Sequence, residues 1–298
     1  MRRLIIMSLL LLSNLFVNGT EYFVRTTGND SNSGLSDAEA WAHHPWMSNW
    51  TGSVILKPGD IVRMRRGDIW SIANPVAAFL TADQSGSPGM PIITTAYGTG
   101  GKPLIRITTA SNVPVVYAAG KSYLTFDNLH IQHHSGNYAL DRDGFKLVQV
   151  CHDIVFTNNE IDNIPSIAIW GRGDCYNIVV GDTTAGKIAT TTEYSNHIHH
   201  FGYAGVGLVG VNPENKESHF FVYYNYIHDA TRTQAGDMEY GIYFSGSESS
   251  SAWPKYAYAR FNRVENIKTW ECLDMHGGSR SEERRVGKEC RFRWWPYH

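Results

Sequence analysis

One short pattern recurs in the second half of the chain and limits the possible folds more than any other feature. A run rich in apolar and aromatic residues ends at an Asn or Asp, and an Ile, Leu or Val follows two residues later. These marker residues, 29 to 37 positions apart, are Asp127, Asn159, Asn196, Asn225 and Asn262. A unit of this length buries its apolar face only by stacking on its neighbours, so the repeat predicts a solenoid. We expect the marker Asn side chains to form a structural ladder of hydrogen bonds inside a bend.

Each unit also holds a Gly-rich segment with apolar residues at alternate positions. Its copies span 144–148, 166–170, 205–209, 241–245 and 272–276. Side chains alternate between the two faces of a strand, so one set should point inward and stack about 4.8 Å apart. The residues predicted to point inward are Phe145, Leu147, Ile167, Ile169, Val206, Leu208, Ile242, Phe244, Leu273 and Met275.

The N-terminus has the pattern of a secretory signal peptide, which we place at residues 1–19. A basic start is followed by an apolar run over 4–17 and by small residues before Thr20. The run is too short and too interrupted for a membrane span, and no second run exists, so we expect a secreted or periplasmic protein. Further on, Ser36 and Glu39 have the spacing of a capping box, which predicts a short capping helix over 36–46.

Several segments of the N-terminal part resemble one known fold family. They are Tyr22–Val24 with Gly28–Asp30, the turn Pro58–Asp60, and the stretch Ile92–Pro103. Together they are similar to the usual N-terminal region of the pectate-lyase-like right-handed parallel β-helix superfamily. The resemblance implies an all-β fold, a single-stranded right-handed parallel β-helix over 20–280. It does not specify a function, because that architecture carries lyases, hydrolases, epimerases and passive surface proteins.

Residues 281–298 break the pattern. They form a dense charge run that ends in aromatic residues, without strand alternation. The segment resembles tails found on unrelated proteins from metagenomic assemblies, so we interpret it as non-native or disordered. We expect the natural sequence to continue the β-helix past residue 280.

Charge and composition restrict the partners. The formal net charge of −2 does not suggest a nucleic-acid partner. The 9 Trp and 16 Tyr are typical of strands and also of sugar-binding surfaces, where flat sugar faces pack on rings. We expect a monomer that acts on an acidic polysaccharide.

The outward positions of the Gly-rich segment predict two columns of side chains. The first is Lys146, Ala168, Gly207, Tyr243 and Asp274, and the second is Val148, Trp170, Val209, Ser245 and His276. The resemblance implies that this face, walled by loops, holds a substrate groove. The loop over 231–240 would bring further polar residues to it. The predicted substrate-binding residues are Trp170, Arg172, Tyr240, Arg232 and Lys146.

We expect a lyase that cleaves uronic-acid polymers by β-elimination. This reaction needs a base, for which His276 and Tyr243 are the candidates. It also needs a positive charge that neutralises the uronate, supplied either by Arg232 or by a Ca²⁺ cofactor. The candidate Ca²⁺ ligands are Asp237, Glu239 and Asp274.

Two alternatives remain open. A glycoside hydrolase needs two carboxyl groups across the scissile bond, which Glu239 and Asp274 could supply. A non-catalytic carbohydrate-binding or cell-surface protein would use the same aromatic residues without turnover.

Two further clusters are ambiguous in the sequence. Cys151 and Cys175 lie one predicted turn of the solenoid apart. They could form a disulfide, or they could be two small buried residues without a bond between them. His197, His199 and His200 share a short strand, but no carboxylate or Cys lies nearby in sequence, which disfavours a metal site.

Overall fold

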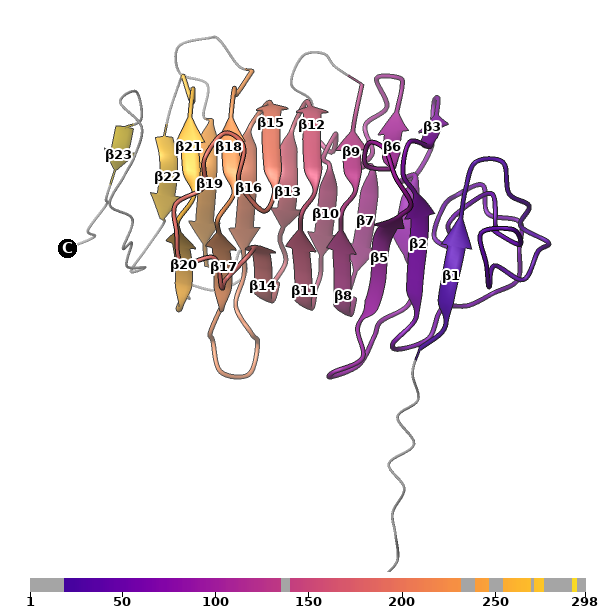
Figure 1. Ribbon diagram of the computed structural model, residues 1–298. Helices are drawn as coiled ribbons and strands as arrows, with labels where there is room; N and C mark the ends of the chain where they lie inside the picture. The colour runs from indigo at the N-terminus through magenta and orange to yellow at the C-terminus, as the bar shows by residue number, and fades with distance from the viewer. Residues whose placement is uncertain are drawn as a thin grey trace, which may run out of the picture.

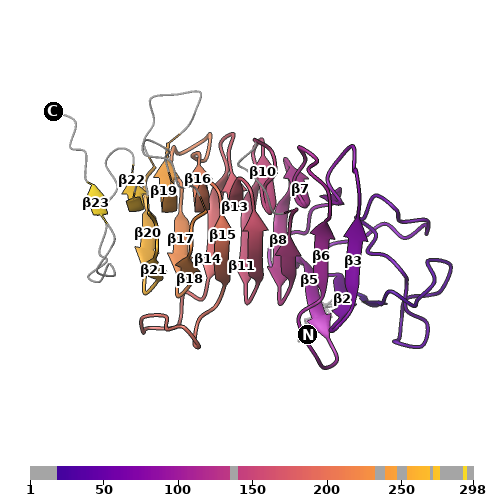
Figure 2. The same cartoon turned by 90° about the horizontal axis from the view of Figure 1, so that it is seen from above.

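A computed structural model describes residues 19–134, 140–231, 239–246, 254–268 and 271–275, and the backbone of 291–293. Within these ranges the chain winds into coils that stack along one axis (Figure 1). Each complete coil contributes one strand to each of three sheets, in the order sheet A, sheet C, sheet B. Every pairing between the strands is parallel, with one coil lying directly on the next (Figure 2). The prediction of a parallel β-helix is therefore confirmed.

The strands have the following bounds. Sheet A contains β1 (Glu21–Val24), β2 (Ile61–Arg65), β5 (Ile92–Tyr97), β8 (Ser122–Asp127), β11 (His152–Thr157), β14 (Tyr176–Gly181), β17 (Phe220–Tyr223) and β20 (Ala257–Arg260). Sheet C contains β3 (Ile69–Ile72), β6 (Leu104–Ile107), β9 (His130–Gln132), β12 (Glu160–Ile164), β15 (His197–Phe201), β18 (Tyr226–His228) and β21 (Arg263–Glu265). Sheet B contains β4 (Leu80–Ala82), β7 (Val116–Ala119), β10 (Phe145–Val148), β13 (Ile167–Gly171), β16 (Ala204–Val209), β19 (Tyr240–Ser245), β22 (Glu271–Met275) and β23 (Arg291–Arg293).

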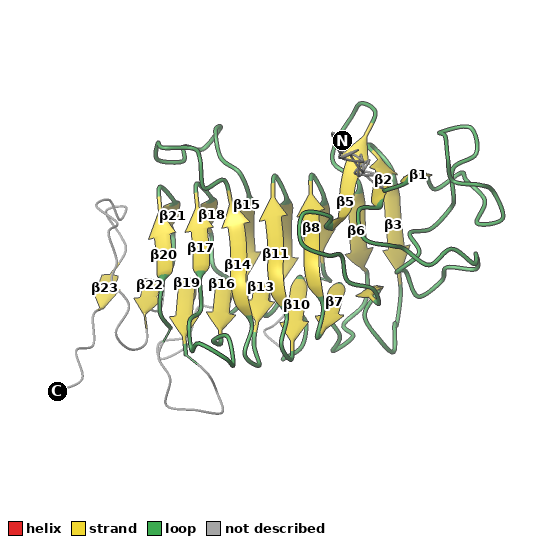
Figure 3. Cartoon of the chain, turned by 90° about the horizontal axis from the view of Figure 1, so that it is seen from below, coloured by secondary structure: helices red, strands yellow, loops and turns green. Residues whose placement is uncertain are grey.

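The described residues contain strands, turns and loops but no helix (Figure 3), so the capping helix predicted over 36–46 is wrong. The expected contact exists, because the backbone N–H of Glu39 lies 3.2 Å from Oγ of Ser36, but it closes a single turn. The backbone of Trp41 instead bonds to the outer edge of β1, donating to Phe23 O and accepting from Arg25 N–H. These sheet-edge bonds replace the ones a helix would need. No described segment forms an apolar helix of membrane-spanning length.

The predicted inward residues of sheet B are all buried. One ladder runs straight through Phe145, Ile169, Val206, Ile242 and Leu273, each at most 1% exposed. Burying a side chain of this size contributes about 1.5–3 kcal/mol. Ile167 is an exception to the predicted row, because it packs in a separate small cluster rather than in the main core.

The predicted ladder is confirmed at all four marker Asn residues, at the bend from sheet A to sheet C. The backbone N–H of Asn159 donates to Oδ1 of Asn196 at 2.9 Å, and that of Asn196 donates to Oδ1 of Asn225 at 3.3 Å. Asn225 bonds in the same way to Asn262 at 3.0 Å. Each Asn Nδ2 also donates to a strand carbonyl of the preceding coil, which satisfies polar groups that have no access to water.

Asp127 is not part of this ladder. It pairs with Thr157, two residues before the Asn position of the next coil. Leu129 takes the ladder position instead, and its backbone N–H donates to Oδ1 of Asn159 at 3.0 Å. The marker was misplaced because Leu has no side-chain amide that would identify it.

One bend carries a long insertion. The chain leaves the ladder after Gly181 and returns at Ser195, whose N–H donates to Tyr224 O, before Asn196 resumes the stack. Gly181 has φ of +107°, and a Cβ there would lie 1.8 Å from Tyr223 O. Glycine is therefore required at the exit.

Cys151 and Cys175 are buried free thiols on neighbouring coils. The hydrogen bond between them lowers the pKa of Cys151 to about 7 and raises that of Cys175. The sequence left open whether Cys151 and Cys175 form a disulfide, and in the structure they do not.

Removing one amide from the ladder should destabilise the fold. Asn196→Ala leaves buried donors of Asn159 without an acceptor, so we expect the free energy of unfolding to fall by about 2–4 kcal/mol. Urea denaturation followed by circular dichroism measures this. Asn158→Gly is the matched control, because Asn158 is exposed at the equivalent bend of the preceding coil with φ of 54°, which glycine tolerates. A loss at Asn196 no larger than that of the control would contradict a structural role for the ladder.

The N-terminal segment buries a neutral histidine, His44, against sheet A. Its Nδ1 accepts the backbone N–H of Trp46 at 3.0 Å, and its Nε2 lies 3.1 Å from Oγ1 of Thr94. Burial lowers the pKa of His44 from 6.5 to about 3. The unfolded chain therefore binds one more proton than the folded chain between these pH values, and stability that is present above pH 6.5 is lost as pH falls.

Replacing His44 should weaken this acid sensitivity. In His44→Asn, the amide oxygen can accept the N–H of Trp46 but cannot be protonated in this range. We expect the slope of unfolding free energy against pH, between pH 6.5 and 4.5, to decrease by up to about 1.4 kcal/mol per pH unit. Urea denaturation at a series of pH values provides the slope, and an unchanged slope would contradict the assignment.

Candidate functional site

The outer face of sheet B carries one continuous column of side chains. The strand register aligns Lys146 with Trp170, Trp170 with Gly207, Gly207 with Tyr243, and Tyr243 with Asp274. The two predicted columns were therefore wrong at β13, where Trp170 replaces Ala168, which is fully buried. A slip of two residues preserves the inward and outward alternation, so the pattern alone could not fix this register.

Four aromatic residues form a surface on this face, which we term the aromatic shelf: Trp170, Tyr203, Tyr240 and Tyr243. Tyr240 contacts both of the other tyrosines, with ring centroids 5.5 Å from Tyr203 and 5.1 Å from Tyr243. Trp170 covers Gly207 so closely that a Cβ there would lie 2.8 Å from its ring. Tyr240 is buried, and the other three are half-buried.

Three buried acidic residues adjoin the shelf, and we term them the carboxylate cluster: Glu239, Glu271 and Asp274. Glu271 and Asp274 lie in the coil that follows Tyr240 and Tyr243. There Glu271 aligns with Tyr240, and Asp274 aligns with Tyr243. Glu239 precedes Tyr240, and its carbonyl accepts the backbone N–H of Glu271 at 3.0 Å. The structure thus places the predicted residue Asp274 beside Tyr243, and Glu239 immediately before the strand that carries Tyr243. Glu271 was missed, although its place at the start of the last repeat was visible in the sequence.

Burial, followed by the neighbouring tyrosines and the charges of Asp274 and Glu271, raises the pKa of Tyr240 well above its usual range. A tyrosine in this state keeps its proton. Its hydroxyl therefore suits hydrogen-bond donation and does not suit the role of a base.

Of the other predicted site residues, Lys146 stands at the opposite end of the column from Asp274. The ammonium of Lys146 is paired with Asp141 and lies 3.6 Å from Oδ2 of the buried Asp143. Arg172 is exposed in the turn after β13, and its backbone N–H donates to Leu147 O. His276, Arg232 and Asp237 lie outside the described residues, so the roles predicted for them stay predictions.

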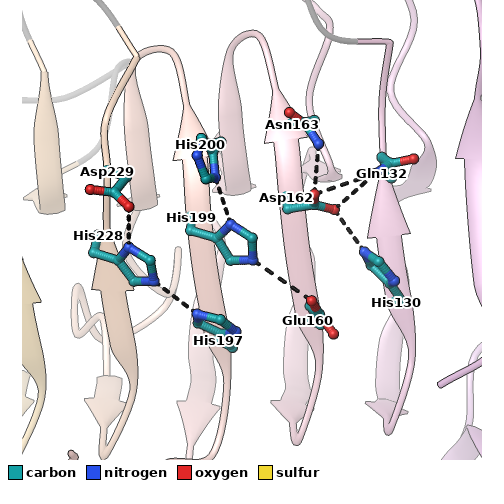
Figure 4. Close-up of polar contacts among 10 residues, drawn as sticks. All are labelled: His130, Gln132, Glu160, Asp162, Asn163, His197, His199, His200, His228 and Asp229. Atoms are coloured by element: carbon teal, nitrogen blue, oxygen red, sulfur yellow. Dashed lines mark hydrogen bonds and ion pairs between the residues drawn. The ribbon is translucent and has the colours of Figure 1, made fainter. Parts of the chain in front are cut away.

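A second polar surface covers the outer face of sheet C, and we term it the histidine grid (Figure 4). It consists of two columns, aligned coil by coil. One is His130, Glu160, His197, Tyr226 and Arg263, and the other is Gln132, Asp162, His199, His228 and Glu265. The sequence argument against a metal here was that no carboxylate lies nearby in the chain. The structure removes that argument, because Glu160 stacks directly beside His197 from the preceding coil.

Contacts in the grid run diagonally, from the first column to the second column of the next coil. His130 Nε2 lies 2.7 Å from Asp162 Oδ1, and Tyr226 donates to Glu265 at 2.6 Å. On the diagonals between these, Glu160 Oε1 lies 3.7 Å from His199 Nε2, and His197 Nε2 lies 2.8 Å from His228 Nε2 (Figure 4). The contact between His197 and His228 therefore joins two imidazoles, whereas each of the other three diagonal contacts includes one carboxylate.

The environment holds these groups in defined charge states. Burial, together with the neighbouring His199 and His228, lowers the pKa of His197 to about 4. The adjacent imidazole of His199 lowers the pKa of Glu160 to about 2. At neutral pH the surface therefore presents a neutral imidazole beside an ionised carboxylate.

A pocket of about 330 Å³ opens where β6, β9 and β12 end, away from the carboxylate cluster. Its lining residues are Arg106, Ile107, Thr108, Gln132, His133, His134 and Asn163. Burial lowers the pKa of His133 to about 4, so this side chain is neutral at neutral pH. The pocket was not anticipated from the sequence.

No protein-family model and no curated protein matches the chain. Among solved structures it is similar to GH136 lacto-N-biosidase from Eubacterium ramulus, with a TM-score of 0.54 and 18% identity over 86% of this chain and 54% of that one. It is also similar to pectate lyase Pel9A, with a TM-score of 0.45 and 14% identity over 86% and 51% of the two chains. The chain thus spans about half the length of both proteins. Likeness at such low identity shows the fold alone.

Proposed function

We propose that the outer face of sheet B binds and cleaves a carbohydrate chain. The observation that carries the proposal is the aromatic shelf that leads directly into the carboxylate cluster. Ligand sites are typically lined by aromatic and apolar side chains with a few convergent polar groups, and this face has that composition.

The shelf has the shape that a sugar ring requires. The absence of a side chain at Gly207 lets Trp170 lie flat across the strand, and Tyr243 continues the surface on the next coil. Half-exposed rings in neighbouring coils can pack against the apolar faces of successive sugar units. The hydroxyl of Tyr240, which keeps its proton, adds a polar group beside them.

The carboxylate cluster supplies the groups for hydrolysis of a glycosidic bond. That reaction needs one carboxyl group that donates a proton and a second that acts as base or nucleophile. Asp274, at the end of the shelf, and Glu239 are the pair we assign, with Glu271 as the neighbour that modulates their charge. The fold is similar to that of a GH136 lacto-N-biosidase, which is consistent with this reaction.

β-Elimination is the second candidate. A carboxylate such as Asp274 is an oxygen ligand of the kind that Ca²⁺ prefers, and a bound Ca²⁺ would neutralise the uronate. Lys146 already pairs with two carboxylates, so a lyase would depend on Arg232, His276 or a calcium ion. Hydrolysis needs only groups that lie in the carboxylate cluster, and we therefore prefer it. In either case we propose that residues 1–19 direct export to the compartment where polysaccharides occur.

Asp274→Asn should reduce cleavage at least about 100-fold without unfolding the chain, since loss of a general acid or base costs that much. Neutral and uronate oligosaccharides are incubated with the protein, and new reducing ends are quantified together with the ultraviolet absorbance of unsaturated products. Reducing ends without that absorbance indicate hydrolysis, and reducing ends with it indicate elimination. Asp182→Asn, a half-buried Asp in the insertion after β14, is the matched control. Full activity in Asp274→Asn would remove Asp274 from the mechanism.

Gly207→Ala should weaken carbohydrate binding while leaving the carboxylate cluster in place. The new Cβ would lie 2.8 Å from Trp170, so the ring must leave its position over the strand. We expect KM to rise about tenfold with little change in kcat, as for a loss of uniform binding. Gly101→Ala is the control, because a Cβ there has no neighbour within 4 Å. Equal KM values for the two variants would show that Trp170 does not contact the substrate.

A further inference from the structure

The histidine grid contains three potential metal ligands that already face one another. Ligand atoms of Glu160, His197 and His199 all lie within 4.8 Å of each other. They come from neighbouring coils, with Glu160 aligned to His197 and His199 two residues along β15. Because a parallel stack fixes this alignment, the three side chains converge without help from a loop.

One of these potential ligands, His199, has a buried ring nitrogen without a hydrogen bond. Nε2 of His199 is buried and has no hydrogen-bond partner, although it points toward Oε1 of Glu160 at 3.7 Å. Its other nitrogen, Nδ1, lies 2.7 Å from Nδ1 of His200. Elsewhere on the grid the same diagonal is closed by hydrogen bonds of 2.6–2.7 Å. The gap between His199 and Glu160 is thus too long for a hydrogen bond and short enough to be bridged by an ion.

We propose that Glu160, His197 and His199 bind one divalent transition-metal ion of the zinc class. Two imidazoles and a carboxylate are ligands that Zn²⁺ prefers, and Ca²⁺ or Mg²⁺ would require more oxygen atoms. With ligand bonds of about 2.0–2.1 Å, tetrahedral ligand atoms lie about 3.3 Å apart. The observed 3.7 Å therefore closes with a shift of a few tenths of an ångström.

Both imidazoles also have the supporting contacts that orient metal-bound histidines. His197 contacts His228, whose Nδ1 lies 2.8 Å from Oδ2 of Asp229, and Asn266 donates to the same carboxylate at 2.7 Å. Since the ionised carboxylate only accepts, His228 Nδ1 is the donor, and its Nε2 accepts from His197. This series of hydrogen bonds fixes the ring of His197, and the contact with His200 fixes the ring of His199 in the same way. The proposal is independent of the carbohydrate site on sheet B.

Zinc binding is tested on the full chain after removal of metal by a chelator. Isothermal titration with Zn²⁺ should show one ion per chain, and Zn²⁺ should raise the melting temperature because it binds the folded state. His199→Ala and the isosteric Glu160→Gln should each weaken Zn²⁺ binding at least about tenfold and abolish the shift in melting temperature. Circular dichroism without metal confirms that each variant is folded.

Two controls make the result specific. His152→Ala removes a half-buried histidine that pairs with Asp153 on sheet A, and it should leave zinc binding unchanged. Cys151→Ser removes one thiol of the buried pair, which is a second potential type of zinc ligand, and should also have no effect. Absence of stoichiometric binding, undiminished binding in both grid variants, or loss of binding in Cys151→Ser would each overturn the proposal.

Discussion

The buried amide stack at the bend between sheets A and C is the interaction on which the rest of the structure depends. Each Asn from Asn159 to Asn225 bonds both to the next Asn and to a carbonyl of the preceding coil, so it sets the position of its coil along the axis and the direction in which the chain leaves the bend. The residues one and three places after each Asn must then point outward in line with those of the next coil. Glu160 follows Asn159 in the same way that His197 follows Asn196, and this is why they meet.

The amide stack thereby joins sequence pattern to chemistry. An outward side chain on one strand has little meaning by itself, because most such residues are simply solvated. Identical offsets from a common marker place residues 37 positions apart in sequence in direct contact. The histidine grid on sheet C is a direct product of this alignment. The face of sheet B is less directly determined, because the loops between sheets C and B differ in length from coil to coil.

This difference explains how much could be predicted from the sequence. The fold, the inward rows and the ladder from Asn159 to Asn262 follow from a repeat with a side-chain amide in it. The register at β13 did not follow, because exchanging Ala168 for Trp170 preserves the alternation. The helix expected over 36–46 failed because the open edge of β1 offered the backbone of Trp41 better partners. For the site, Asp274 beside Tyr243 was predictable, whereas Glu160 beside His197 was missed because proximity was judged along the chain and not across coils.

The excursion between Gly181 and Ser195 shows what the scaffold leaves free. The chain departs through a glycine that no other residue can replace, covers the distance of a normal bend, and rejoins the stack with Asn196 in register. The cross-section of the solenoid is therefore independent of the sequence inserted at this bend. In such an architecture, an insertion at one bend adds new surface without changing the packing of the core.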